Sequence, residues 1–385
     1  MLNYLTNYLP HRRIYRIAVS SFFFMAGLCF SSWASRIPAI QLRLHLSNAG
    51  LGAVLLALPT GLLISLPIAG WLVARVGSRS IVIGAALLYA LTLPMLGMAK
   101  NTAQLVICLF VFGMGGNMLN ISMNTQAVGT ESMYGRSIMA SYHGLWSLAG
   151  FTGAAIGTLF VGIGLAPWEH FLIISVLALI IVALASGHLL KEDINKNEQQ
   201  PIFARPDRTL ISLGLIAFCS MICEGAMFDW SGVYFQKVVQ PENGLVTAGY
   251  TAFMCTMATG RFVGDWVTTK AGKKKTLQIS GILTAVGLLI AVGFPYFLTA
   301  VTGFLLVGAG VSSVVPLIYS SAGKSKILSP GVAIAAVSTI GYLGFLFGPP
   351  FIGFIAQASS LRISLGLIAL LGSTIAIIAA RSRIE

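Results

Sequence analysis

Residues 14–34 have the sequence IYRIAVSSFFFMAGLCFSSWA, which contains a single charged side chain, Arg16. A helix of about 20 apolar residues crosses the hydrocarbon core of a bilayer, so this run is long enough to span it. It is too long for the apolar core of a signal peptide and lacks a convincing small-residue cleavage site. We therefore expect residues 14–34 to form a membrane-spanning helix.

Eleven more apolar runs follow this one. Charged residues make up only 9% of the 385-residue chain and hydrophobic residues 56%, whereas a soluble domain has about 25% charged residues. The sequence predicts an all-α membrane protein with twelve transmembrane helices. The predicted spans are residues 14–34, 49–71, 80–99, 102–125, 139–163, 169–190, 208–236, 248–268, 276–294, 298–322, 331–356 and 361–381.

The basic residues predict the orientation of these helices. With the N-terminus in the cytoplasm, 18 of the 24 Lys and Arg residues lie in inner segments and 5 in outer ones, and Arg261 falls at a helix end. This bias predicts that both termini are cytoplasmic. The net charge of +13 then matches contact with anionic membrane lipids, and we expect no nucleic-acid partner.

A polar stretch, residues 191–208 (KEDINKNEQQPIFARPDR), divides the chain in two. Its composition is typical of a linker, so we expect six-helix bundles over residues 1–190 and 209–385. Three pairs of segments, about 190 to 197 residues apart, indicate that the bundles are repeats. They are Ser32–Ala34 and Asp229–Ser231, Gly113–Asn117 and Gly308–Ser312, and Leu148–Phe151 and Tyr342–Phe345.

Residues 70–79 (GWLVARVGSR) resemble the GxxxDRxGRR signature of the major facilitator superfamily, except that Ala74 replaces the aspartate. The corresponding part of the second half, residues 260–265, keeps an acid at Asp265. The resemblance covers the whole chain and implies the major facilitator fold, in which two six-helix repeats give alternating access to one solute.

Three further segments resemble a poorly characterised bacterial inner-membrane branch of that superfamily, near the fucose-type sugar–proton symporters. They are Asn120–Asn124 (NISMN), His143–Trp146 (HGLW) and Glu224–Trp230 (EGAMFDW). This resemblance implies location in the inner membrane.

Two carboxylates lie properly within a predicted span, Glu224 and Asp229, both in residues 208–236. An acid in a membrane span is costly and by default a functional candidate. A low dielectric favours its neutral form, so such a group can take up and release a proton. We predict that these two residues couple transport to protons, with Glu224 as the main one; a structural hydrogen-bonded carboxylate is the alternative.

Polar and aromatic side chains within the spans are candidates for solute binding. Asn117, Asn120 and Asn124 share one helix face and suit the hydroxyl groups of a neutral solute, although bonding between helices would also explain them. His143 could line the cavity, take part in gating or be an ordinary hydrogen-bonded histidine. The remaining candidates for contact with the solute are Trp146, Trp33, Trp230 and Tyr319, with interfacial anchoring as the alternative for the two repeat-related tryptophans.

Charged residues near the predicted cytoplasmic helix ends are candidates for gating. Glu131 and Arg136 with Arg75 and Arg79 could form one network, and Arg261 with Asp265 another. Ala74 weakens the first of them.

Together these features predict a secondary active transporter, working by proton symport, for a small, polar, sugar-like solute. The predicted spans place no arginine mid-membrane, which disfavours a strongly anionic solute. Proton-coupled export, a non-transporting sensor and a membrane enzyme remain alternatives, although HExxH, GxSxG and GxxxxGK[ST] motifs are absent. We expect protons, the solute and membrane lipids as partners, a monomer, and neither a cofactor, a disulfide nor a metal site.

Overall fold

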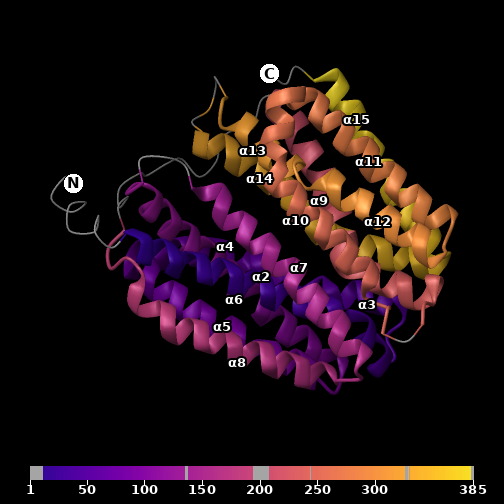
Figure 1. The fold of residues 1–385 in the computed structure, drawn as a ribbon, viewed down its shortest axis with the longest axis horizontal. Helices are drawn as coiled ribbons and strands as arrows, with labels where there is room; N and C mark the ends of the chain where they lie inside the picture. Colours follow the sequence, from indigo (N-terminus) through magenta and orange to yellow (C-terminus); the bar gives the residue numbers. More distant parts are fainter. Residues whose placement is uncertain are drawn as a thin grey trace. The chain divides into compact units, whose positions relative to one another are not determined.

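The computed structural model of the chain describes residues 12–134, 138–193, 208–242, 244–325, 328 and 330–382. Regular structure in these ranges consists entirely of helices (Figure 1). By internal packing the chain forms two compact units. Unit 1 comprises Met1–Arg36 with Ala57–Glu198, and unit 2 comprises Ile37–Leu56 with Gln199–Glu385.

Unit 1 contains most of the helices from the first half of the chain. They are α2 (Arg12–Arg43, up to Arg36), α4 (Ala57–Val76), α5 (Ser78–Met98), α6 (Thr102–Glu131), α7 (Met139–Gly162), α8 (Pro167–Ala185) and the short 3-10 turn η2 (Ser186–His188).

Unit 2 contains the second half together with the end of α2 and one short helix. Its elements are α3 (Asn48–Leu55), α9 (Arg208–Tyr234), the π-helical turn η3 (Phe235–Val239), α10 (Ala248–Ala271), α11 (Lys273–Gly293), α12 (Phe297–Val311), α13 (Val314–Ala322), α14 (Pro330–Ala358) and α15 (Leu361–Arg381).

The helices confirm the predicted all-α membrane fold. Ten of the predicted spans each coincide with one helix, and two are interrupted, at Leu56 between α3 and α4 and at residues 312–313 between α12 and α13. In the described part of the chain, eleven spans are long and apolar enough to cross a membrane. The one predicted span outside this set is residues 248–268, which form α10 and include the charged residues Arg261 and Asp265, with Lys270 just beyond.

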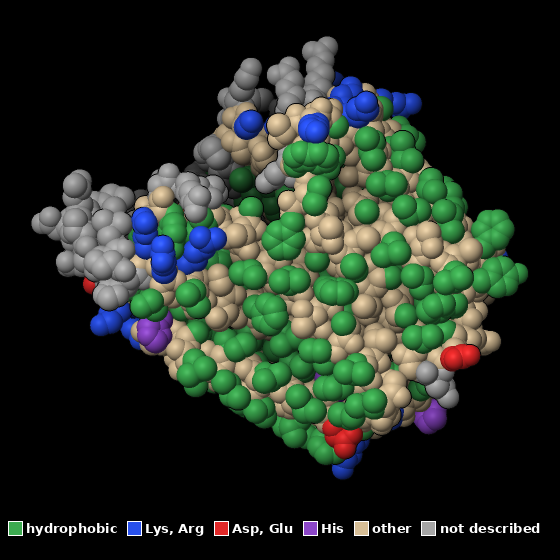
Figure 2. Space-filling model, in the orientation of Figure 1, with side chains coloured by type: hydrophobic (Ala, Val, Ile, Leu, Met, Phe, Trp, Pro, Cys, Tyr) green, Lys and Arg blue, Asp and Glu red, His purple; other side chains and the backbone are tan. Residues whose placement is uncertain are grey.

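Many large apolar side chains are exposed at the described surface. Hydrophobic side chains cover the middle of the face seen in Figure 2, and charged side chains lie at its margins. Leu184 and Leu298, for example, expose 71% and 75% of their area. A soluble monomer rarely exposes continuous apolar patches of more than a few hundred Å², so this surface matches a protein surrounded by lipid.

Repeat-related glycines bring helices together within each unit. Gly113 of α6 packs against the carbonyl oxygen of Leu58 in α4, and Gly308 of α12 packs against that of Phe253 in α10. Both glycines and both partners are 195 positions apart (113 and 308, 58 and 253). The predicted repeat therefore extends to the atoms that make these helix crossings.

The neighbouring contact is also repeated, with a change in chemistry. In unit 1, Gly61 lies against the carbonyl oxygen of Phe110. The residue 195 positions later is Thr256, and its hydroxyl donates to the carbonyl of Leu305 at 2.7 Å. Small residues let helix backbones approach closely, and a threonine can replace part of that packing by a hydrogen bond.

We predict that Gly113→Ala lowers stability by about 1–3 kcal/mol, because the added methyl group overlaps the Leu58 carbonyl and forces α4 away from α6. The midpoint of thermal unfolding in detergent measures the effect. Gly84→Ala is the matched control: no atom lies within 4 Å of its added methyl group, so it should be neutral or slightly stabilising. Equal midpoints for the two variants would show that the crossing does not require glycine.

Candidate functional site

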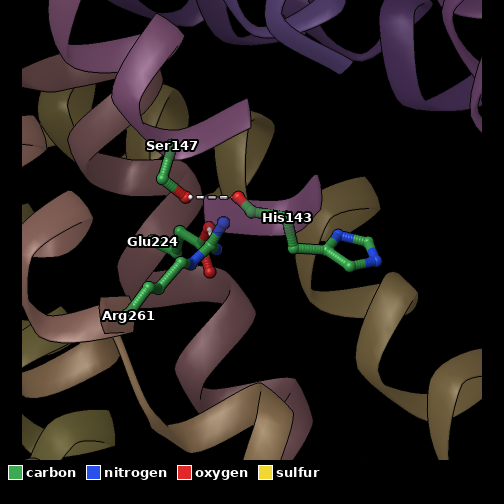
Figure 3. A network of polar contacts seen from close by, with 4 residues as sticks. All are labelled: His143, Ser147, Glu224 and Arg261. Atoms are coloured by element: carbon green, nitrogen blue, oxygen red, sulfur yellow. Dashed lines mark hydrogen bonds and ion pairs between the residues drawn. The ribbon is translucent and has the colours of Figure 1, made fainter. Parts of the chain in front are cut away.

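A buried ion pair links two helices of unit 2. Glu224 lies in α9 and Arg261 in α10, and Nη2 of Arg261 donates to Oε1 of Glu224 at 3.3 Å (Figure 3). The Glu224 side chain is 7% exposed and the Arg261 side chain 18%. Removal of one partner from such a pair leaves an uncompensated charge in a medium where charge is costly. The state of either group therefore affects how α9 and α10 are held together.

Both members of the pair lie well inside their helices. Glu224 follows the start of α9 at Arg208 by 16 residues, or about 24 Å, and Arg261 follows the start of α10 at Ala248 by 13, or about 20 Å. Two sequence-based expectations are therefore wrong: Arg261 is not at a helix end, and an arginine does lie within a membrane helix. The predicted span, residues 248–268, ends only three residues before α10 does, and Arg261 lies seven residues inside even that predicted end.

Aromatic side chains of unit 2 lie near Glu224. The phenol groups of Tyr319 in α13 and Tyr342 in α14 lie within electrostatic range of it. One helical turn beyond Glu224, Phe228 packs against Phe253 of α10 and Phe345 of α14, with ring centroids 5.7 and 6.5 Å apart. Residues four apart share a helix face. Glu224 thus shares its face of α9 with a phenylalanine that packs against α10 and α14.

Asp229 differs from Glu224 although both are on α9. It is half-buried, and within the residues that the structure describes its carboxylate has no hydrogen-bond or ion-pair partner. A carboxylate inside a span that lacks a cationic partner can be neutralised by a proton or by a cation from outside the chain. The two acids are therefore chemically distinct, one paired and one unpaired.

In unit 1, the candidate aromatic residues of α7 lie against α2. His143 is exposed, and its ring meets Phe23 edge to face at 5.4 Å between centroids. Trp146 is half-buried and lies 6.1 Å from Phe30. Ser147 Oγ donates to the His143 carbonyl at 3.1 Å (Figure 3), so the imidazole is not used in that bond. The His143 side chain is thus exposed at the surface of α7, while its backbone carbonyl is bonded to Ser147.

The three asparagines of α6 have different roles in the structure. Asn117 is buried, and its Nδ2 donates to the hydroxyl of Ser65 in α4 at 2.9 Å. This is a bond between helices, the alternative explanation for the stripe. Asn120 and Asn124 are half-buried. Asn124 Nδ2 donates to the backbone carbonyl of Asn120 at 2.8 Å and to its Oδ1 at 3.0 Å. Asn120 and Asn124 are thus bonded to each other on one face of α6.

The repeat-related tryptophans lie in the packed interior of their own units. Trp33 is 1% exposed and packs near Phe171, and Trp230 is 0% exposed. Neither indole N–H has a hydrogen-bond partner among the described residues. In this structure the two side chains are packing residues, and neither ring is accessible to a solute.

The candidate gating residues are separated into different environments. Glu131 Oε2 accepts hydrogen bonds from the backbone N–H groups of Ile138 and Met139 at the start of α7, at 2.7 and 2.8 Å. The Arg75 guanidinium is exposed and lies 5.2 Å from the Trp71 ring centroid. Arg79 is half-buried in the first turn of α5. Arg136 and the Asp265 side chain lie outside the described parts of the structure, so neither proposed latch can be built from it.

Sequence reasoning missed one buried polar cluster. Arg36 is one of the five basic residues that the predicted spans leave in outer segments, but α2 continues to Arg43 and Arg36 is only 2% exposed. Its Nε donates to Nδ1 of His170 in α8, and its Nη1 donates to the Leu165 carbonyl, both at 3.0 Å. Because Nδ1 of His170 accepts this bond, the imidazole is neutral with its proton on Nε2. The stretch of α2 beyond the predicted span, residues 35–43 (SRIPAIQLR), contains four polar or charged residues and gave no hydropathy signal.

Helices of membrane-spanning length, a lipid-compatible surface and charged groups inside the spans define a multi-pass membrane protein. Buried charges and hydrogen-bonding groups at such positions are typical of proteins that move polar solutes or ions.

Comparison with known proteins identifies the family. The sequence profile of the Major Facilitator Superfamily matches residues 17–326. An uncharacterised MFS-type transporter of Yersinia pestis is 35% identical over 354 residues, which cover 92% of each chain. The chain belongs to the major facilitator superfamily; it is therefore a secondary transporter and not an enzyme.

Solved structures show the same fold at low sequence identity. A single-residue variant of the Escherichia coli fucose:proton symporter FucP superimposes with a TM-score of 0.64 and 17% identity, covering 95% of this chain and 97% of the other. A mutant of the nucleoside transporter NupG gives a TM-score of 0.74 and 13% identity, covering 95% and 99%. At these identities the likeness establishes the fold alone.

Proposed function

We propose that this transporter moves a small, neutral, sugar-like solute together with protons across the bacterial inner membrane by alternating access. Both termini then lie in the cytoplasm, and the chain works as a monomer. The observation that carries the proposal is the buried Glu224–Arg261 pair, a titratable acid held by a cation between two helices of unit 2.

A proton on Glu224 removes the charge that holds Arg261. The neutral acid can still hydrogen-bond, but the attraction between the two side chains is lost while the arginine stays charged. The contact between α9 and α10 thus differs in the two protonation states. A solute that binds better to one of these states becomes coupled to the proton, because a ligand shifts an equilibrium by its differential affinity.

The balance of charge supports a neutral solute. Arg261 lies within a span, so the expected lack of arginine no longer argues against an anion. The pair is nevertheless neutral as a whole, and a free anion would have to compete with Glu224 for the guanidinium. Phenol groups of Tyr319 and Tyr342 and half-buried asparagine amides suit hydroxyl groups. The neighbours in fold are named for fucose and for nucleosides, which are also hydroxylated solutes.

Asp229 is the second acid in this proposal. Without a partner in the described structure, it can hold a proton that never competes with an arginine. In this proposal, protonation of Glu224 changes the contact between α9 and α10. Asp229 is a candidate proton relay nearer the end of α9 at Tyr234.

The test is a thermal-shift screen of the purified full-length protein against neutral sugars, polyols, nucleosides and their acidic counterparts at two pH values, one on each side of neutrality. We expect a neutral hydroxylated compound to raise the unfolding midpoint and then to accumulate in proteoliposomes when a pH gradient is imposed. If only the acidic compounds stabilise the protein, the proposed solute class is wrong. Accumulation that is independent of the pH gradient would rule out proton symport.

A further inference from the structure

The turn between α4 and α5 lacks an acid of its own. Gly77 has a left-handed backbone (φ 92°), and α5 begins at the next residue, Ser78. The first N–H groups of a helix have no partner within it, and a carboxylate is the favoured group at that end. Residues 70–79 contain neither Asp nor Glu. The repeat-related turn in unit 2 has the same geometry at Gly272 (φ 80°) and is followed by Lys273–Lys275.

A carboxylate from far along the chain completes the first turn. Asp193 follows the end of α8, and its Oδ2 accepts a hydrogen bond from the Ser78 backbone N–H at 2.8 Å. Its Oδ1 accepts a second bond from the Ser78 hydroxyl. Asp193 thus caps a helix that begins 115 residues earlier. Hydrogen bonds to an ionised acceptor are about twice as strong as those between neutral groups.

A buried amide joins these two segments to a third. Gln126 of α6 is 1% exposed. Its Nε2 donates to Ser78 Oγ at 2.7 Å and to the Leu190 carbonyl at 3.0 Å, and its Oε1 accepts from the Leu190 N–H at 2.8 Å. The start of α5, α6 and residues 190–193 are therefore tied by five hydrogen bonds around Ser78 and Gln126.

We infer that Asp193 and Gln126 form a polar lock that fixes the beginning of the connection between the two halves of the chain to the α4–α5 turn. Residue 193 is the last described residue before residue 208, where α9 begins. Residues 190–193 are consequently held at a fixed point, and the start of α5 and the segment after α8 belong to one body. The lock lies apart from the Glu224–Arg261 pair and goes beyond the proposed function.

Hydrogen–deuterium exchange and limited trypsin cleavage of the full-length protein test the lock. Asp193→Ala should speed exchange of the Ser78 and Leu190 amides about tenfold, because a helix cap of this kind and a charge-assisted bond are lost together. Cleavage after Lys191, an exposed residue, should accelerate by a similar factor. Glu192→Ala removes the neighbouring exposed acid but leaves the five bonds around Ser78 and Gln126 in place, so it should speed exchange of the Ser78 and Leu190 amides much less than Asp193→Ala does.

A double-variant cycle makes the test specific to the lock. Ser78→Ala alone should also speed both processes, because it removes the hydroxyl that bonds Asp193 and Gln126. Its effect should be smaller in the Asp193→Ala background than in the wild type, because the two variants share the bond from Ser78 Oγ to Asp193. Asp193→Asn, which keeps an accepting oxygen, should recover part of the protection. Wild-type rates in Asp193→Ala, or fully additive effects in the double variant, would overturn the inference. If Asp193→Ala does not yield folded protein, Ser78→Ala and Asp193→Asn carry the same comparison.

Discussion

Replacement of Glu224 by glutamine should abolish uphill transport driven by a pH gradient. Glutamine keeps the size of the acid and its ability to hydrogen-bond, but it cannot gain or lose a proton. One proton carried with each solute allows about tenfold accumulation per unit of pH gradient, since one pH unit corresponds to about 1.36 kcal/mol. In the variant the accumulation ratio should fall to about 1, because no proton then drives the solute uphill, while solute binding and downhill exchange persist.

Proteoliposomes with an imposed pH gradient provide the measurement, using the solute found by the thermal-shift screen. Glu224→Asp is the matched control, because it keeps a titratable group on α9 and should retain part of the accumulation. Wild-type accumulation with unchanged pH dependence in the glutamine variant would make Glu224 a structural residue. Asp229→Asn, which removes the unpaired acid, would then be the next variant to measure.

Replacement of Arg261 by methionine should destabilise the protein by about 3–5 kcal/mol, because it leaves the Glu224 charge buried without its partner. The double variant Glu224→Gln with Arg261→Met should recover most of this loss, since a neutral amide replaces the orphaned carboxylate. The expected recovery separates loss of the pair from mere loss of packing at Arg261.

Unfolding midpoints in detergent, measured for both single variants and the double variant, complete this cycle. Lys274→Met is the control, because Lys274 is an exposed cation in the first turn of α11, and most surface substitutions stay within about 0.5 kcal/mol. A double variant as unstable as Arg261→Met alone would mean that the Glu224 charge is not what destabilises the single variant.

The sequence predicted the helices well because the bilayer imposes one length and one composition on all of them. Residues 361–381, for instance, were predicted as a span and form α15 over the same bounds. Prediction from the sequence was less successful where a helix contains charged residues or extends beyond its apolar part. Arg261 was placed at a helix end and Arg36 outside the membrane helices, yet both lie within helices and have specific partners. Hydropathy averages over a window, so the polar residues after Ala34 ended the first predicted span, and such an average does not show whether a charged residue has a compensating partner on another helix.

By itself, the sequence determined the all-α membrane fold, its spans and the repeat spacing that relates Gly113 to Gly308. These follow from local rules, because every backbone polar group in lipid must be satisfied within its own helix and glycine marks close crossings. It also singled out Glu224 and Asp229, because an acid within a span is rare. Only the tertiary structure paired Glu224 with Arg261, 37 residues away, and left Asp229 without a partner in the described chain. The same holds for Arg36 with His170 and for Asp193 with Ser78, which are 134 and 115 residues apart. Such pairs depend on the rotation and depth of each helix against its neighbours, and packing between helices sets both.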